Sequence, residues 1–350
     1  MLFTRTSPLL RRAALGLSLL AVLTGCGNDD EKPKPQPLVV AGQSVLVVNE
    51  GTTKGAVSLF DKASRSVQRD IFKSVNAREL GKFVQSMTVV GEQAYVVVNG
   101  DGTIQVVNVP DFKQVAEIKN LSQPRFMAVL NGKGYVTEWQ GTWPNYTTGR
   151  VSVINLATNS VERTINTGIG INPEHILAAN GKVYVANSYG TTISVIDPAA
   201  GAVTGIINAP MGPKHLALDA NGNMWALCSM FGGATHTLFR FNPAQPSLTE
   251  TIIPLPFTYG NGNLIGKGNK MYASLGSQVY ALDLNATTLP ARPLIARDFY
   301  GLGIDPKEDV IYGGDAGNFT SDGRVVRYSL TGTALDSFNV AIAPNSFVFY

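Results

Sequence analysis

The sequence predicts an all-β protein built as a seven-bladed β-propeller with four antiparallel strands in each blade. The first observation is a repeat, because an aromatic or apolar residue that opens a β-like segment recurs every 40 to 49 residues. The repeat positions are Leu46, Tyr95, Tyr135, Tyr184, Trp225, Tyr272 and Tyr312. A period of about 40 to 50 residues with four strands per copy is typical of propellers, whereas solenoid repeats of similar length are helical or have fewer strands.

Residues 170–208 show the repeating unit most clearly. An apolar segment at 175–178 ends at Asn180-Gly181, and this dipeptide favours a two-residue hairpin turn because both residues accept positive φ. The predicted strands of this unit are 175–178, 183–186, 193–196 and 203–207. A sheet of this kind buries one face only beside another like it, so we expect copies along the chain.

The second observation is a Pro-x-x-apolar pattern that opens successive blades. It occurs as Pro124-Arg125-Phe126, Pro173-Glu174-His175 and Pro213-Lys214-His215. This regularity favours a propeller over a β-sandwich with accidental similarity between hairpins. The predicted blades two to seven are 83–119, 124–166, 173–208, 213–254, 260–297 and 299–340.

Blade one is predicted to be closed by the C-terminus. Its own segments, 45–48, 57–60 and 67–72, supply the second to fourth strands, and residues 346–349 after Pro344 match the opening of a first strand. Such closure removes the exposed sheet edges that otherwise invite aggregation. An alternative closure uses residues 38–40 as an extra strand.

Residues 1–25 are predicted to be a bacterial lipoprotein signal peptide. Three arginines precede a short apolar run, and Leu23-Thr24-Gly25-Cys26 resembles a lipobox, which implies lipidation of Cys26. The apolar run is shorter than the roughly 20 residues that a membrane-spanning helix needs. The alternative is an ordinary signal peptide followed by a chance cysteine.

Residues 26–37 are predicted to form a flexible stalk between the lipid anchor and the propeller at 38–350. Prolines favour extended polyproline II, at about 3 Å per residue. Asp29-Asp30-Glu31 resembles the acidic signal that sends lipoproteins of Bacteroidota to the cell surface, although a solvated linker also explains it.

Removal of residues 1–25 takes away three arginines and no acidic residue, so 28 basic against 25 acidic residues become 25 against 25. A neutral chain does not indicate a nucleic-acid partner.

The loops divide the ring into two unequal faces. The turn face, which carries the turns between first and second and between third and fourth strands, has uniformly short turns such as Asn180-Gly181. The loop face carries the irregular loops 138–150, 229–236 and 313–323, where function on a repeat fold is expected.

The candidate ligand-binding residues are aromatic side chains and histidines on this face and at the first positions of the blades: Trp139, Trp143, Tyr146, Tyr189, Phe231, Phe319, Phe126, His175, His215, Tyr259 and Tyr300. Rings with amide and hydroxyl groups around them suit a large, flat, polar-fringed ligand.

No catalytic or metal-binding residues are predicted. His175 and His215 occupy equivalent repeat positions, which favours structural hydrogen bonding between blades over metal ligation or base catalysis. His236 has no partner identifiable from the sequence, and Cys228 ends a strand and is expected to be buried. We find no nucleophile elbow, phosphate loop, HExxH motif or zinc-ligand spacing.

The segments Tyr184-Val185-Ala186-Asn187 and 193–197, with a weaker copy at 135–137 and 151–155, resemble YVTN-type, YncE-like propellers. With the lipobox and the terminal Pro344-Asn345-Ser346-Phe347, the chain is most similar to the Bacteroidota surface lipoproteins of the BtuG-like (DUF5074) group. The resemblance implies a propeller anchored outside the outer membrane. For the best-known members it also implies capture of cobalamin for a TonB-dependent transporter. No cofactor is predicted beyond cobalamin as a bound ligand.

Three classes of function remain open at this stage. A surface-anchored binding protein is favoured by the anchor, the stalk and the aromatic loop face. A lactonase-like propeller enzyme would need polar or metal-liganding residues at the channel mouth, where the sequence indicates mainly aromatics, amides and glycine. A structural subunit of an envelope complex would present a flat apolar patch.

Overall fold

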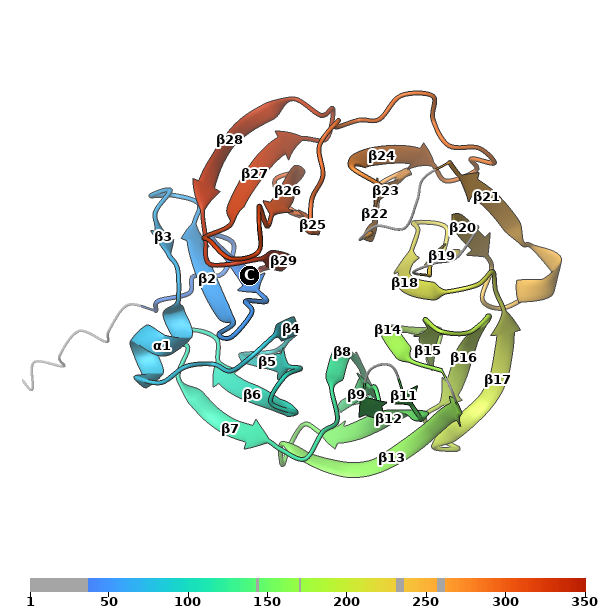
Figure 1. Ribbon diagram of the computed structural model, residues 1–350, viewed down its shortest axis with the longest axis horizontal. Coiled ribbons are helices and arrows are strands. Elements are labelled where there is room, and N and C mark those ends of the chain that lie inside the picture. Colours follow the sequence, from blue (N-terminus) through green and yellow to red (C-terminus); the bar gives the residue numbers. More distant parts are fainter. Residues whose placement is uncertain (1–36, 143–144, 170, 231–235, 257–261) are drawn as a thin grey trace, which may run out of the picture. The chain divides into compact units, whose positions relative to one another are not determined.

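Seven blade sheets stand around a central axis in the computed structural model, which describes residues 37–142, 145–169, 171–230, 236–256 and 262–350 (Figure 1). Each blade is an antiparallel meander whose first strand lies at the axis and whose last strand lies at the outer edge. The predicted all-β, seven-bladed propeller is therefore confirmed. Cys26 and the predicted signal peptide and stalk up to residue 36 lie outside the described residues.

The C-terminal strand closes blade one, as predicted. In order from the axis outward, this sheet contains β29 (Pro344–Phe349), β1 (Ser44–Asn49), β2 (Ala56–Asp61) and β3 (Val67–Gln68). Val45 pairs with Phe349 and Val47 pairs with Phe347 in the antiparallel register. The alternative closure is absent from the described residues, because Leu38 and Val39 instead donate backbone hydrogen bonds to the carbonyl of Pro110.

Blades two to five follow the predicted boundaries closely, and three of them begin at Pro124, Pro173 and Pro213. Blade two contains β4 (Val84–Val90), β5 (Gln93–Val98), β6 (Thr103–Asn108) and β7 (Gln114–Ile118). Blade three contains β8 (Pro124–Leu130), β9 (Lys133–Glu138), β12 (Thr148–Asn155) and β13 (Ser160–Ile169), with the small hairpin β10 (Gly141–Thr142) and β11 (Asn145–Tyr146) inserted after β9. Blade four contains β14 (Pro173–Ala179), β15 (Lys182–Asn187), β16 (Thr192–Asp197) and β17 (Ala202–Asn208). Blade five contains β18 (Pro213–Leu218), β19 (Met224–Cys228), β20 (His236–Phe241) and β21 (Thr251–Leu255), with the 3-10 helix η1 (Pro246–Leu248) before β21.

Blade six has a reduced outer edge, whereas blade seven is complete. Blade six contains β22 (Leu264–Lys267), β23 (Lys270–Leu275) and β24 (Gln278–Asp283), and its outer position is marked by one isolated bridge between Val279 and Ile295. Pro290 and Pro293 lie in this outer segment, and proline lacks the N–H group that a continuous strand requires. Blade seven contains β25 (Gly301–Ile304), β26 (Val310–Asp315), β27 (Arg324–Ser329) and β28 (Ala334–Asn339).

The outer strand of blade one is shorter than the predicted 67–72, because the chain turns into helix α1 (Ile71–Asn76). Asp70 caps the helix, since its side chain accepts a hydrogen bond from the backbone N–H of Lys73, and Ile71 and Phe72 are fully buried. In the described part of the chain, no helix has the length and apolarity needed to cross a membrane.

The core is divided among the interfaces between neighbouring blades. The described residues form seven buried apolar clusters, one at each of these interfaces. The second strand of a blade is buried on both faces, as the fully buried β1 and β19 show. This arrangement explains why these strands are continuously apolar, and it makes the ring a rigid frame for the residues at its axis.

The turn face has the geometry that its sequence predicts. Asn180 and Gly181 adopt φ values of 50° and 72°, and Asn131 and Gly132 adopt 52° and 72°. Both residues of each pair therefore lie in the left-handed region, as a two-residue hairpin of the favoured type requires.

Candidate functional site

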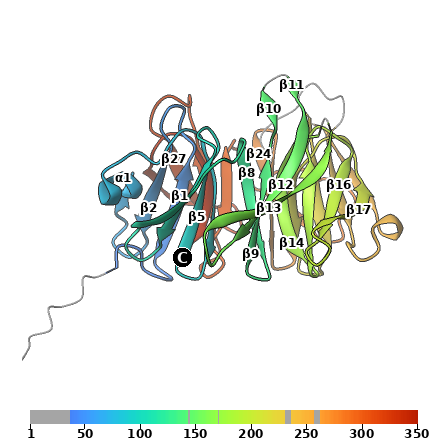
Figure 2. The ribbon, with the colours of Figure 1, turned by 90° about the horizontal axis from the view of Figure 1, so that it is seen from below.

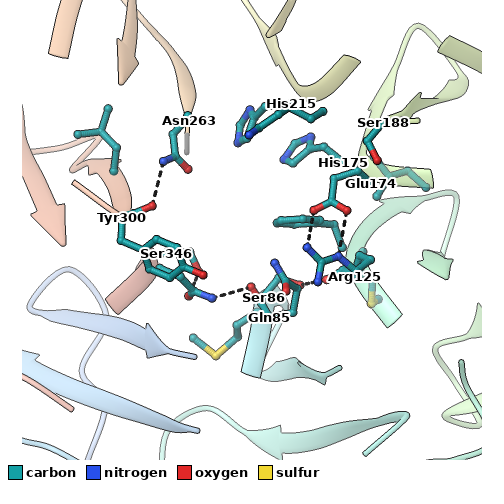
Figure 3. Close-up of a pocket in the computed structure, with 18 of the residues that line it drawn as sticks. Gln85, Ser86, Arg125, Glu174, His175, Ser188, His215, Asn263, Tyr300 and Ser346 are labelled. Atoms are coloured by element: carbon teal, nitrogen blue, oxygen red, sulfur yellow. Dashed lines mark hydrogen bonds and ion pairs between the residues drawn. The ribbon is translucent and has the colours of Figure 1, made fainter. Parts of the chain in front are cut away.

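All seven blades contribute to one cavity of about 480 Å³ at the axis of the ring. Its wall comes from the beginnings of the first strands, which meet where each blade starts on the loop face. Figure 3 shows these side chains arranged around the channel, with Arg125, Glu174 and His175 on one side and Tyr300 and Ser346 on the other. A concave site of this size with several convergent polar groups is typical of small-molecule binding sites.

Hydrogen bonds between blades hold the wall in place. The Ser86 hydroxyl donates to the carbonyl of Arg125 over 2.7 Å, and the Thr137 hydroxyl donates to the carbonyl of Glu174 over 2.7 Å. The Asn345 amide donates to the carbonyls of Val84 and Gln85 over 3.0 and 3.1 Å. The backbone of each lining strand is thus fixed by its neighbour, so the wall is preorganised.

An ion pair crosses from blade three to blade four in the wall. Arg125 makes two hydrogen bonds to Glu174, from Nε to Oε2 over 3.0 Å and from Nη2 to Oε1 over 2.7 Å. The two side chains are only 17% and 12% exposed. Burial alone would lower the pKa of Arg125, but the Glu174 charge and hydrogen bonds raise it. The pair is therefore ionised and geometrically fixed.

Lys214 adds a second cation to the same wall from blade five. It follows Pro213 as Arg125 follows Pro124 and Glu174 follows Pro173. Burial lowers the pKa of the Lys214 ammonium from 10.5 to about 8, partly offset by the charge of Glu174. Lys214 therefore carries its charge at neutral pH and loses it in mildly alkaline solution.

Two stacked histidines line the wall beside these charges. The rings of His175 and His215 lie 4.0 Å apart with an interplanar angle of 26°. The backbone N–H of Leu216 donates to Nδ1 of His175 over 3.4 Å, which links blade five to blade four. Burial lowers the pKa of His175 from 6.5 to about 4, and burial together with the neighbouring His175 and Lys214 lowers the pKa of His215 well below 6.5. Both rings are therefore neutral at pH 7.

The opposite wall holds a carboxylate behind a tyrosine. The Tyr300 hydroxyl donates a hydrogen bond to Oε2 of Glu50, and the Asn263 amide donates to the carbonyl of Tyr300 over 3.3 Å. Burial raises the pKa of Glu50 even though the Tyr300 hydrogen bond and the Arg125 charge oppose this shift. Burial and the Glu50 charge raise the pKa of Tyr300, so its hydroxyl remains protonated and acts as a donor.

Three aromatic side chains form a cluster at the rim of the cavity: Trp139, Tyr189 and Tyr146. Tyr146 belongs to the β10–β11 hairpin, which stands above the ring in Figure 2. The Trp139 ring centroid lies 5.2 Å from that of Tyr146 and 6.3 Å from that of Tyr189, and Tyr146 and Tyr189 are 6.0 Å apart. The indole N–H of Trp139 donates to the carbonyl of Pro173 over 3.0 Å, and the Arg125 guanidinium lies 4.4 Å from the Trp139 ring. Trp139 is thus held rigidly against the charged wall, whereas Tyr189 is 40% exposed.

A family model described as Domain of unknown function (DUF5074) matches residues 43–345. The chain belongs to the DUF5074 family. No curated protein matches this DUF5074 chain.

Solved structures that resemble this DUF5074 chain share its fold at low sequence identity. A quinonprotein alcohol dehydrogenase-like protein from Bacteroides thetaiotaomicron has a TM-score of 0.68 and 14% identity over 88% of this chain and 78% of its own. A functionally unknown protein from Desulfotomaculum acetoxidans has a TM-score of 0.63 and 12% identity over 87% and 98%. Hydrazine synthase of Kuenenia stuttgartiensis has a TM-score of 0.53 and 16% identity over 76% and 91%. At these identities the likeness establishes the propeller fold alone.

Most of the described candidate residues lie together. Six of them line the cavity: Phe126, Trp139, His175, Tyr189, His215 and Tyr300. Tyr146 contacts Trp139 and Tyr189 at the rim, and Phe319 packs edge-on against Tyr300 with ring centroids 5.0 Å apart. Trp143, Phe231 and Tyr259 lie outside the described residues.

The charged residues of the wall were missed by the sequence-based prediction. The channel mouth was expected to hold mainly aromatics, amides and glycine, but Arg125, Glu174 and Lys214 line it. Their common signal is their place directly after the proline that opens a blade. The side chain at that position is the first of its blade to face the axis. A charged residue directly after the proline therefore lies in the channel wall.

Outside this wall, the reactive residue types have structural explanations. Nδ1 of His236 is hydrogen-bonded to the Ser229 hydroxyl over 2.8 Å, a partner that the sequence did not reveal. Cys228 is fully buried, as expected, and burial raises the pKa of its thiol to about 12. The described residues contain no group of three or more His, Cys, Asp or Glu side chains that could hold a metal ion.

Proposed function

We propose that this DUF5074 protein is a lipid-anchored binding protein that holds a small molecule in the loop-face mouth of its central channel. The observation that carries the proposal is a cavity to which all seven blades contribute. Its wall is polar and charged, and its rim is aromatic. A ligand there gains apolar contact from the rings and orientation from fixed hydrogen-bonding groups.

The wall favours binding over chemistry on a substrate. Arg125 and Glu174 neutralise each other through two hydrogen bonds, and burial lowers the pKa of both histidines, which makes them weak bases at pH 7. Uncharged side chains of the wall such as Gln85 and Ser346 can also hydrogen-bond to a ligand. Such groups recognise amide and hydroxyl substituents.

We propose a corrinoid such as cobalamin as the ligand to test first. A corrinoid combines a broad ring with peripheral amides, which matches an aromatic rim over a polar cavity. A cavity of about 480 Å³ would take part of this molecule, while the macrocycle would lie across Trp139 and Tyr189 at the rim. Further support comes from the resemblance of the sequence to BtuG-like and YncE-like propellers.

The proposed location is the outer membrane, with the propeller on the cell surface beside a TonB-dependent transporter. Support comes from the lipobox at Cys26 and the acidic, proline-rich residues that follow it.

We expect Cys26→Ala to abolish membrane association while the propeller still folds, because a lipid chain is needed to anchor it. Protease treatment of intact cells should remove the wild-type protein. Its survival would contradict surface exposure.

Calorimetric titration with cyanocobalamin tests the binding proposal. We expect wild-type protein to bind, and Tyr189→Ala to weaken binding by about ten- to a hundredfold, since loss of one aromatic contact costs about 1 to 3 kcal/mol. Gly181→Ala, on the turn face, is the matched control and should leave affinity unchanged. Absence of heat with the wild type would refute the corrinoid, and equal affinity in Tyr189→Ala would remove the rim from the site.

A further inference from the structure

A fully buried carboxylate lies at the base of the loop that carries Trp139. Glu138 is the last residue of β9, directly before Trp139, and its side chain is 0% exposed. Its Oε2 accepts hydrogen bonds from Nη2 of Arg150 over 2.8 Å and from the backbone N–H of Ser122 over 2.5 Å, and its Oε1 accepts from the Ser152 hydroxyl. A buried carboxylate with three donors around it is held in one orientation.

The same place holds an asparagine in two other blades. Asn49 ends β1 and Asn187 ends β15, and both side chains are fully buried. The side-chain oxygen of Asn49 accepts a hydrogen bond from Ser58 over 2.7 Å. The Asn187 amide donates to the Ser194 hydroxyl over 3.0 Å. An amide is therefore sufficient to bind the equivalent serine, so the contact with Ser152 does not explain why blade three uses a carboxylate.

Blade three differs from these blades in the loop between its second and third strands. Residues 139–149 lie between the paired positions Glu138 and Arg150, whereas residues 50–55 and 188–191 lie between the corresponding positions of blades one and four. At the place of Arg150, those two blades have the uncharged residues Ala56 and Thr192. A longer loop has more conformations to lose, so ordering it requires additional contacts. The ion pair supplies such a contact, because it joins the two ends of the loop.

Ser122 connects this ion pair to the rim of the cavity. Its backbone N–H binds Glu138, and its hydroxyl donates to the carbonyl of Trp139 over 2.8 Å. The indole N–H of Trp139 donates in turn to the carbonyl of Pro173, and the Trp139 ring packs edge-on against Tyr146. The position of Trp139 therefore depends on a chain of hydrogen bonds that begins at the buried carboxylate.

We infer that Glu138 and Arg150 are positioning residues for the binding rim, and that their ion pair, acting through Ser122, holds Trp139 where the ligand meets it. This inference deepens the proposed function and rests on it. Neither side chain is among the described residues that line the cavity, so both act on a ligand only through Trp139. An amide at position 138 keeps the serine contact but loses the charge-assisted hydrogen bonds to Arg150 and Ser122.

A double-mutant cycle tests whether the ion pair acts through Trp139. In calorimetric titrations with cyanocobalamin we expect Trp139→Ala to weaken binding by about ten- to a hundredfold and Glu138→Gln by about tenfold. In the Trp139→Ala background, Glu138→Gln should cause no further loss, because the side chain that it positions is already absent.

Variants of Arg150 repeat the test at a partly exposed position, where folding is less affected. Arg150→Gln should weaken binding as Glu138→Gln does, and Arg150→Lys, which keeps the charge, should retain most of the affinity. Asp305→Asn is the matched control. Asp305 is an equally buried carboxylate on the turn face, 1% exposed and paired with Lys62 over 2.8 Å, and its replacement should leave the affinity unchanged even where stability falls.

Quenching of tryptophan fluorescence by acrylamide reports on Trp139 without any ligand. Trp225 is fully buried, and a Trp143→Phe background removes the other tryptophan of the loop, so a change in quenching reports on Trp139. We expect Glu138→Gln to raise the quenching constant in this background, because Trp139 is released from its place, and Asp305→Asn to leave it unchanged.

The outcomes separate this inference from the proposed function. Wild-type affinity and wild-type quenching in Glu138→Gln overturn the inference. A loss of affinity in Glu138→Gln that persists in the Trp139→Ala background also overturns it, because the ion pair then acts by another route. Absence of cyanocobalamin binding by the wild type contradicts the proposed ligand, and the quenching comparison then decides whether the ion pair positions Trp139.

Discussion

At the scale of single residues, the site depends on side chains that become neighbours only when the ring closes. Arg125 and Glu174 lie 49 positions apart, yet they form two hydrogen bonds because each directly follows the proline that opens its blade. His175 and His215 stack for the same reason. Equivalent positions in successive blades are therefore contact positions at the axis.

The stacked histidines predict a specific loss of stability in acid. Burial lowers the pKa of His175 to about 4, so the unfolded chain binds a proton between pH 6.5 and 4 that the folded chain does not. Its contribution is fully present above pH 6.5 and is lost as the pH falls towards 4, a change on the order of 3 kcal/mol in the free energy of unfolding.

His175→Asn tests this prediction. The asparagine side-chain oxygen can accept the Leu216 hydrogen bond in place of Nδ1, but it does not titrate. Urea unfolding at pH 7 and pH 4 should show a smaller loss of stability in the variant than in the wild type. An identical loss in both proteins would contradict the buried, neutral state of His175.

The sequence alone predicted the aromatic and histidine residues of the site more successfully than its charges. Trp139 and Tyr189 stand out because they interrupt short loops on one face. Arg125, Glu174 and Lys214 do not stand out, because a charge beside a proline at a blade start also suits a solvated turn. Only the ring geometry places all three on one wall.

At the scale of elements, the apolar repeat of the blades explains the strands, and local sequence explains where single elements depart from the repeat. Continuous apolar segments predicted the second strands, which are buried on both faces. The short β3 and the helix α1 escaped prediction because Ile71 and Phe72 extend an apolar strand pattern, while capping by Asp70 and tertiary burial favour a helix. Pro290 and Pro293 explain the reduced outer edge of blade six.

Substitution of Gly181 tests the left-handed conformation assigned to the turn at Asn180-Gly181. Gly181 has a φ of +72°, and a Cβ added there meets no atom within 4 Å, so Gly181→Ala introduces backbone strain without a clash. We expect the free energy of unfolding to fall by about 1 kcal/mol. Gly205→Ala in β17 is the matched control, since its Cβ makes an ordinary contact of 3.6 Å with Val195, and thermal denaturation should show no loss there. Equal effects of the two changes would contradict the turn assignment.

The closing strand β29 carries the largest expected effect of any element. It pairs with β1 along its length, and Asn345 also links it to blade two through Val84 and Gln85. Deletion of residues 344–350 exposes the edge of β1 and opens the ring. We expect aggregation or a loss of cooperative unfolding, measured by light scattering and urea titration. A soluble truncated protein of unchanged stability would show that closure does not depend on β29.

At the scale of the whole molecule, one face of the ring carries the tight turns and the other carries the proposed binding site. The turn face holds tight hairpins, and the apolar clusters between blades hold the ring together. The loop face surrounds the cavity with an ion pair, a lysine and an aromatic rim. Repeat spacing predicted the ring and the more irregular face, because both follow from strand order. The cavity wall could not be predicted in the same way, because it requires side chains from seven blades at one place.

Blocking the channel tests the central claim that ligand binds in this cavity. Gln85 is a partly buried lining residue of blade two, so Gln85→Trp should fill the cavity without disturbing the apolar clusters. Thr158→Trp, exposed in the β12–β13 turn on the opposite face, controls for the added indole. In calorimetric titrations with cyanocobalamin we expect Thr158→Trp to match the wild type and Gln85→Trp to bind on the order of a hundredfold more weakly, about 3 kcal/mol. Wild-type affinity in a folded Gln85→Trp protein would contradict the claim.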